Sequence, residues 1–275
     1  MIFLTTRCQH QCAHCCFNCS PQSGVDMPDA MLKDVIERAA AVHLLYHVTL
    51  VGGEPFIKPR RLLRVLRQLL NGYGVWDLFI PTNGRWVLAS SYIDIAEEMQ
   101  KLAQFVPHGI CVAFSENPWN LEQLGTHAGK ALERWRQLEE RFPGLFTIRR
   151  LDEKEMKNIG RAKINEIART SDVVGAHCDF DDWLDPGQGI GFLSDYLTFW
   201  PDGTVRTCYA GGPILGRYDD DYQRLLEKRT GYLLWLRRKR DGTFSYGNLN
   251  YKACENCEQN YEVYSTLGEN ASPNQ

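Results

Sequence analysis

Five cysteines lie close together near the start of the chain, and three of them have a spacing that can hold a metal cluster. Cys8, Cys12 and Cys15 form the pattern C-x3-C-x2-C directly after a short apolar run. Three thiolates can bind three irons of a [4Fe–4S] cluster and leave the fourth iron open to an added ligand. Cys16 and Cys19 follow at once, and we interpret them as structural or spare thiols.

A tetrahedral zinc site is the competing interpretation of this loop. Zinc in structural sites takes four ligands. The fourth ligand beside the three cysteines could come from Cys16, Cys19, His10 or His14. The spacing alone favours an iron–sulfur cluster and leaves zinc open.

Two turns whose residues could bind a ligand follow the next two apolar runs. The first consists of Gly52, Gly53, Glu54 and Pro55, and the second of Thr82, Asn83 and Gly84. Glycine lets a backbone approach a ligand closely, and a carboxylate suits an ammonium group. The carboxyl ends of parallel strands meet at one edge of a sheet, so both turns are expected beside the cysteines.

Together these motifs resemble those of the radical S-adenosylmethionine (SAM) superfamily. C-x3-C-x2-C is the cluster motif of that family, and residues 52–55 resemble its motif for the amino group of SAM. The resemblance implies that residues 52–55, Thr82 and Asn83 bind SAM. It also implies that Ser115, at the end of the fourth predicted strand, lies near the SAM ribose, and that Arg149, at the end of the fifth, holds the SAM carboxylate.

Four further cysteines lie in the C-terminal part of the chain: Cys178, Cys208, Cys254 and Cys257. The last two form C-x2-C, and Cys208 closes a predicted hairpin around residues 201–203. This arrangement resembles the C-terminal extension called SPASM, and with four cysteines its shorter twitch form. The resemblance implies an auxiliary [4Fe–4S] cluster held by these four thiols.

Other interpretations of the C-terminal cysteines stay open. Cys254 and Cys257 could form a small zinc knuckle, and His177, Asp179 or the substrate could replace Cys178 as a ligand. Tyr209, beside Cys208, is the candidate catalytic residue, as a hydrogen donor, although a packing role is the plainer alternative.

The resemblance implies an enzyme that cleaves SAM reductively to a 5′-deoxyadenosyl radical, which removes a hydrogen atom from substrate. An auxiliary cluster favours an oxidative outcome, either dehydrogenation or cross-linking, on a peptide or a small molecule. The electron would come from an external reductant such as flavodoxin or ferredoxin. An epimerase, an enzyme with only structural zinc in its C-terminal part, and a non-catalytic iron–sulfur electron carrier or scaffold are the alternatives.

The elements that must position these residues alternate between strand and helix over the first 150 residues. Strands are predicted over residues 2–6, 48–51, 78–81, 110–114 and 145–149, and helices over 28–42, 60–70, 93–105 and 121–142. Repeated β-α units indicate an α/β fold with a parallel sheet, and the family resemblance implies a partial (β/α)6 barrel over residues 1–165. A hairpin over 197–208 and a helix over 222–240 are expected in an extension spanning 166–275.

Composition limits the remaining classes. The chain has 275 residues, a formal net charge of −3 and 44% hydrophobic residues, so nothing in its bulk charge predicts a nucleic-acid partner. No apolar run approaches the roughly 18 residues of a membrane span. Ten cysteines without a signal peptide predict a cytoplasmic protein with metal or redox chemistry.

Overall fold

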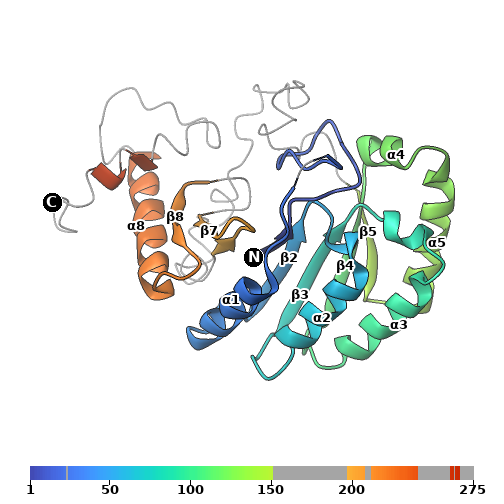
Figure 1. Cartoon of the computed structure of the whole chain (residues 1–275), viewed down its shortest axis with the longest axis horizontal. Coiled ribbons are helices and arrows are strands. Elements are labelled where there is room, and N and C mark those ends of the chain that lie inside the picture. The colour runs from blue at the N-terminus through green and yellow to red at the C-terminus, as the bar shows by residue number, and fades with distance from the viewer. Residues whose placement is uncertain (23, 151–196, 208–211, 241–260, 263, 267–275) are drawn as a thin grey trace.

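The computed structural model describes residues 1–22, 24–150, 197–207, 212–240, 261–262 and 264–266. Within these ranges, eight strands form one sheet in the order β5-β4-β3-β2-β1-β6-β7-β8. Helices lie one after another along one side of the part of the sheet formed by β1 to β5 (Figure 1).

The first five strands are parallel and confirm the predicted α/β class. They are β1 (Ile2–Thr5), β2 (His47–Gly52), β3 (Asp77–Thr82), β4 (Ile110–Glu116) and β5 (Phe146–Arg150). A sixfold barrel would also need residues 151–196, which lie outside the described part, so the partial barrel stays a prediction.

The predicted hairpin is confirmed and continues the same sheet. β6 (Thr198–Phe199) pairs with β1 in parallel, while β7 (Thr204–Arg206) and β8 (Ile214–Arg217) are antiparallel to their neighbours. The turn between β6 and β7 is closed by Asp202, whose Oδ1 accepts the N–H of Thr204 at 2.9 Å. The small C-terminal strands therefore extend the free edge of β1.

The core lies between the sheet and its covering helices. These are α1 (Asp29–Ala41), α2 (Pro59–Leu69), α3 (Tyr92–Ala103) and α5 (Ala128–Arg141). Their apolar faces pack on alternate strand residues: in β3, Leu78 and Ile80 are buried, whereas Phe79 and Pro81 between them are half-buried. The second set points to the opposite face of the sheet, because successive side chains of a strand alternate.

The prediction of one helix over residues 121–142 is wrong. The chain instead forms α4 (Pro118–Leu124), a 3-10 turn (Gly125–His127) and α5. Gly125, with φ 57° and ψ −132°, ends α4 in a conformation that favours glycine. Asn117 caps the start of α4, its Oδ1 accepting the N–H of Asn120 at 2.9 Å. The break leaves α4 as a short helix at the carboxyl edge of the sheet (Figure 1).

Helix α8 (Tyr222–Arg240) has the predicted bounds and packs on the hairpin. Its Arg229 is only 1% exposed and donates from Nε to the carbonyl oxygen of Thr207 at 3.2 Å. Across the described residues, no helix combines the length and the apolar character that crossing a membrane requires.

Candidate functional site

The cysteine loop, residues 8–19, begins just beyond the carboxyl end of β1 and is fixed mainly through Cys8. The Cys8 side chain is buried, and its N–H donates to the carbonyl oxygen of Ser20 at 3.4 Å. Its Sγ accepts hydrogen bonds from the backbone N–H of His10 at 3.3 Å and from Nδ2 of Asn83 at 3.6 Å. A sulfur held by N–H donors suits a metal-bound thiolate.

The remaining thiols of the loop have different environments. Cys19 is buried, whereas Cys12, Cys15 and Cys16 are half-buried, and none of the five is in a disulfide. Burial, followed by the nearby charges of Glu54 and Cys15, raises the pKa of Cys8 to about 12. A hydrogen bond with Cys15, followed by burial, raises the pKa of Cys19. Metal binding would have to displace these protons.

The donor set fits an iron–sulfur cluster by its chemistry, since thiolates are the usual ligands of such clusters. In the described ranges, no group of three or more Cys, His, Asp or Glu side chains has the arrangement of a metal site. Three thiols of the predicted motif nevertheless share one loop, and the first of them is already held as a hydrogen-bond acceptor. Their role as iron ligands therefore stays a prediction.

Gly53 brings the end of β2 against the cysteine loop. The N–H of Gly53 donates to the carbonyl oxygen of Thr5 at 2.8 Å. The N–H of Glu54 donates to the carbonyl oxygen of Arg7 at 3.0 Å. A Cβ at Gly53 would lie 2.2 Å from the Arg7 oxygen and 3.0 Å from Cβ of Cys8. Only glycine fits there, which gives the Gly-Gly pair a structural reason.

Glu54 is fully buried and accepts three hydrogen bonds. Its Oε1 accepts from the N–H of Phe56 at 2.9 Å and from Oγ1 of Thr82 at 2.7 Å, and its Oε2 accepts from the N–H of Asn83 at 2.7 Å. Burial raises its pKa to about 7, while the three donors act in the opposite direction. A carboxylate offers about four acceptor positions, so one position on Oε2 remains for a cationic donor.

The turn at residues 82–84 brings the end of β3 to the same place. Gly84 has φ 74°, and a Cβ there would lie 2.5 Å from the ring of Phe114. Oδ1 of Asn83 accepts the N–H of Arg85 at 2.9 Å, which shapes the turn. Asn83 thus contacts both Glu54 and Cys8, and three motifs that are far apart in sequence meet as predicted.

Sequence reasoning did not assign a role to Asn120 and considered His10 only as a zinc ligand. Both are almost fully buried, and Nδ1 of His10 lies 2.8 Å from Oδ1 of Asn120. Nδ2 of Asn120 donates to the carbonyl oxygens of Asn83 at 3.0 Å and Ser115 at 2.8 Å. Both amide protons are then used, so Oδ1 must accept, and His10 carries its proton on Nδ1. The Asn-Pro start of α4 was the available signal for Asn120.

The charge state of His10 follows from its surroundings. Burial is the main cause, and the charge of Arg85 adds to it, so that the pKa of His10 is lowered to about 4 despite its hydrogen bond with Asn120. The ring is therefore neutral near pH 7. A neutral ring with the proton on Nδ1 is the form that the Asn120 contact requires.

The structure places the other predicted SAM residues at the same edge but does not test their roles. Ser115 and Arg149 are register partners on β4 and β5, so their side chains share one face of the sheet. Arg150 points to the other face, where its Nε lies 2.9 Å from Oε2 of Glu116. Pro55 is buried and starts a 3-10 turn. The remaining predicted residues, Cys178, Cys208, Tyr209, Cys254 and Cys257, lie outside the described residues.

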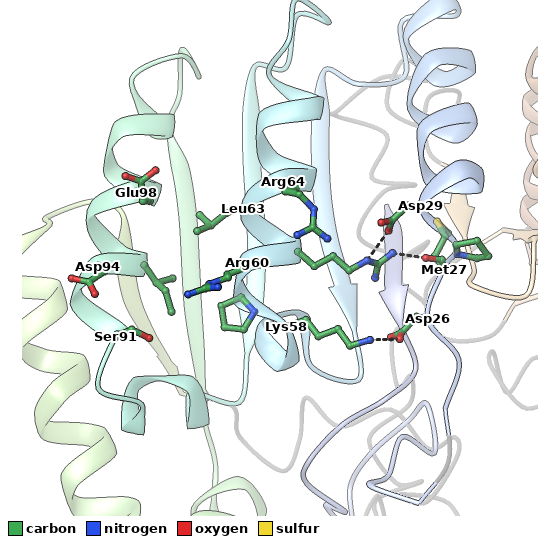
Figure 2. Close-up of a pocket in the computed structure, with 14 residues that line it drawn as sticks. Asp26, Met27, Asp29, Lys58, Arg60, Leu63, Arg64, Ser91, Asp94 and Glu98 are labelled. Atoms are coloured by element: carbon green, nitrogen blue, oxygen red, sulfur yellow. Dashed lines mark hydrogen bonds and ion pairs between the residues drawn. The ribbon is translucent and has the colours of Figure 1, made fainter.

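A groove of about 860 Å³ lies on the helix side of the sheet (Figure 2). Two ion pairs cross its lining: Lys58 Nζ lies 2.7 Å from Asp26 Oδ2, and Arg61 Nε lies 2.9 Å from Asp29 Oδ1. Arg61 also donates to the carbonyl oxygens of Leu4, at 3.1 Å, and Met27. These contacts connect the start of α2 to the start of α1. None of the predicted site residues lines the groove.

The first part of the chain is similar to a known family of enzymes. Residues 2–117, which contain the cysteine loop and both turns, match the family model of the radical SAM superfamily. The matched range includes the predicted cluster motif. In the structure this motif follows β1, the first strand of the parallel part of the sheet.

Two individual proteins are similar to the chain. It is 27% identical over 92 residues to the "Putative peptide biosynthesis protein YydG" of Bacillus subtilis (strain 168); the match covers 34% of this chain and 28% of YydG. The chain therefore matches little more than a quarter of the length of that relative. A crystal structure of BtrN in complex with AdoMet and 2-DOIA is similar with 13% identity and a TM-score of 0.49, over 88% of each chain.

Proposed function

We propose that the chain is a radical SAM enzyme in which Cys8, Cys12 and Cys15 hold a [4Fe–4S] cluster beside a SAM site at Glu54. The observation that carries the proposal is the position of Asn83, which donates to Glu54 with its backbone and to Cys8 with its side chain. The two halves of a radical SAM site, cluster and SAM, would need this proximity. When bound there, the cluster and SAM would supply a 5′-deoxyadenosyl radical for removal of a hydrogen atom from substrate.

The residues of the chain have separate tasks in this site. Gly53 allows the SAM turn to approach the cysteine loop, and Glu54 keeps one acceptor position for the amino group of SAM. Ser115 and Arg149 are proposed for the ribose and the carboxylate, since they share a face at the carboxyl ends of β4 and β5. The further proposed SAM contacts come from the two turns: Gly52, Pro55 and Thr82.

We propose a peptide as the substrate and an oxidative change, dehydrogenation or cross-linking, as the reaction. Support for a peptide comes from the similarity to YydG, which is named for peptide biosynthesis. A small-molecule substrate and an epimerase reaction are the alternatives. Flavodoxin or ferredoxin is the proposed reductant.

The C-terminal part is proposed to be a twitch-type extension over residues 166–275, after a partial (β/α)6 core over 1–165. Its four cysteines would hold the auxiliary [4Fe–4S] cluster, and Tyr209, which follows Cys208 in sequence, would be the candidate hydrogen donor. We propose a cytoplasmic location, because the cysteines proposed as cluster ligands need a compartment that keeps thiols reduced.

Metal analysis of anaerobically reconstituted protein tests the assignment of both clusters. The parent should hold about eight irons, and a variant with Cys8, Cys12 and Cys15 changed to Ala about four, since each four-iron cluster needs its own ligand set. Cys111→Ala, in a half-buried position on β4, is the control and should keep all eight. Zinc in place of iron in the triple variant would contradict the auxiliary cluster. An unchanged iron content in that variant would contradict the cluster at Cys8.

A further inference from the structure

The sulfur of Cys8 accepts one hydrogen bond from outside its own loop. The N–H of His10, at 3.3 Å, belongs to the cysteine loop itself. Nδ2 of Asn83, at 3.6 Å, comes from the end of β3, 75 residues further along the chain. Asn83 therefore acts on this thiol from an independent element, and its contact can be removed without changing the loop sequence.

The orientation of the Asn83 amide is fixed by its own turn. Oδ1 of Asn83 accepts the N–H of Arg85 at 2.9 Å. The amide nitrogen is consequently the atom that faces Cys8, and it can only donate. The main chain of Asn83 is also held, because its N–H donates to Glu54 at 2.7 Å.

Asn120 holds the other side of the same turn. It is 2% exposed and donates from Nδ2 to the carbonyl oxygen of Asn83 at 3.0 Å. Its second amide proton reaches Ser115, and its Oδ1 faces His10. Asn120 thus ties the turn at residues 82–84 to the cysteine loop and to the end of β4.

We propose that Asn83 raises the reduction potential of the cluster held by Cys8, and that Asn120 is a positioning residue that keeps the Asn83 amide on that thiolate. The inference rests on the proposed function. Reduction adds negative charge to a cluster and its thiolates, so an N–H donor stabilises the reduced form more than the oxidised form. The effect is large in a buried site, where hydrogen bonds are electrostatically stronger than in water.

This assignment gives Asn83 a task beyond SAM binding. Glu54 is buried beside Cys8, and its negative charge disfavours the addition of another negative charge nearby. The Asn83 amide opposes that effect at the sulfur itself. The site therefore combines Glu54, which makes reduction of the cluster harder, with Asn83, which makes it easier.

The test is a redox titration of the reconstituted full chain, followed by electron paramagnetic resonance. The cluster at Cys8 is recognised because its signal changes when SAM is added. Asn83→Ala removes the donor but keeps the backbone hydrogen bonds. Asn83→Asp keeps Oδ1 for Arg85 and replaces the donor by a carboxylate oxygen. Gln123→Ala is the matched control. Oε1 of Gln123, on α4, accepts the N–H of Gln11 in the cysteine loop at 2.9 Å, and Gln123 does not contact Cys8.

We expect Asn83→Ala to lower the equilibrium constant for reduction about tenfold, which is about 59 mV for a one-electron couple. Asn83→Asp should lower it further, and Gln123→Ala should not change it. Asn120→Ala should shift the potential in the same direction by less, and should add nothing in the Asn83→Ala background. Unchanged potentials in both Asn83 variants, with full iron content, would overturn the inference. An additive effect of Asn120→Ala would overturn its positioning role. Absence of any SAM-responsive signal in the parent would instead contradict the proposed function.

Discussion

The backbone N–H of Asn83 donates to Oε2 of Glu54 at 2.7 Å, so the end of β3 is bound directly to the turn after β2. The same carboxylate accepts from Phe56 and Thr82. Glu54 therefore organises the site as well as offering an acceptor to SAM. Substitution of Glu54 should therefore change both the affinity for SAM and the free energy of unfolding, by different amounts.

Glu54→Gln should weaken SAM binding about tenfold or more while iron content stays at the parent level. A hydrogen bond to a charged group contributes about 1.5–3 kcal/mol, and the variant keeps the size of the side chain but not its charge. Equilibrium titration with SAM measures the affinity. Glu122→Gln, an exposed change on nearby α4, is the control and should bind SAM like the parent. Equal affinity in both variants would remove Glu54 from the SAM site.

The raised pKa of Glu54 predicts a loss of stability at high pH in the absence of SAM. Burial raises the pKa of the Glu54 carboxyl from its usual 4.5 to about 7, so the folded state holds the proton more tightly than the unfolded state. The free energy of unfolding should therefore fall as pH rises from about 4.5 through 7, by about 3 kcal/mol in total.

Urea unfolding of the parent and of Glu54→Gln at pH 5 and pH 8 measures this loss. The parent should lose more stability than the variant between the two pH values. His10 acts in the opposite direction, since its lowered pKa costs stability as pH falls from about 6.5 towards 4. Its effect is common to both proteins and cancels in the difference. Parallel pH profiles for the two proteins would show that Glu54 does not titrate in this window.

Gly53→Ala should displace the cysteine loop and reduce the iron content of reconstituted protein. The added Cβ would meet the Arg7 carbonyl oxygen at 2.2 Å, and that atom belongs to the backbone and cannot turn away. Gly129→Ala is the control, because it lies in α5 with nothing within 4 Å of its Cβ position. The control should keep the iron content of the parent. A full iron content in Gly53→Ala would contradict the close approach of the two segments.

Trp200 joins the C-terminal hairpin to the first strand, and its removal should destabilise the protein. Its ring stacks on Phe3 at 4.2 Å and meets Phe17 of the cysteine loop edge-on at 6.0 Å. Trp200→Ala should cost about 2–4 kcal/mol, somewhat below the range for a fully buried aromatic side chain. Trp76→Ala, which removes an exposed tryptophan stacked on Tyr46, should cost far less. Equal losses in thermal unfolding of the two variants would contradict this coupling.

The sequence was sufficient for the local features with strong periodicity. Strands and helices of the first 150 residues lie where apolar spacing predicted them, because each buries one face against the next. The exception was residues 121–142, where the helical pattern continues across Gly125 although the backbone there leaves the helix. The contacts of Asn120 could not be predicted, because they depend on how three separate loops meet in space.

Formation of 5′-deoxyadenosine by reconstituted, dithionite-reduced protein tests the central claim most directly. Chromatography of the reaction with SAM should show slow formation of 5′-deoxyadenosine by the parent, and none by the variant with Cys8, Cys12 and Cys15 changed to Ala. If the parent carries its full iron load and still forms no 5′-deoxyadenosine, the assignment of a radical SAM site to the cysteine loop and Glu54 is contradicted.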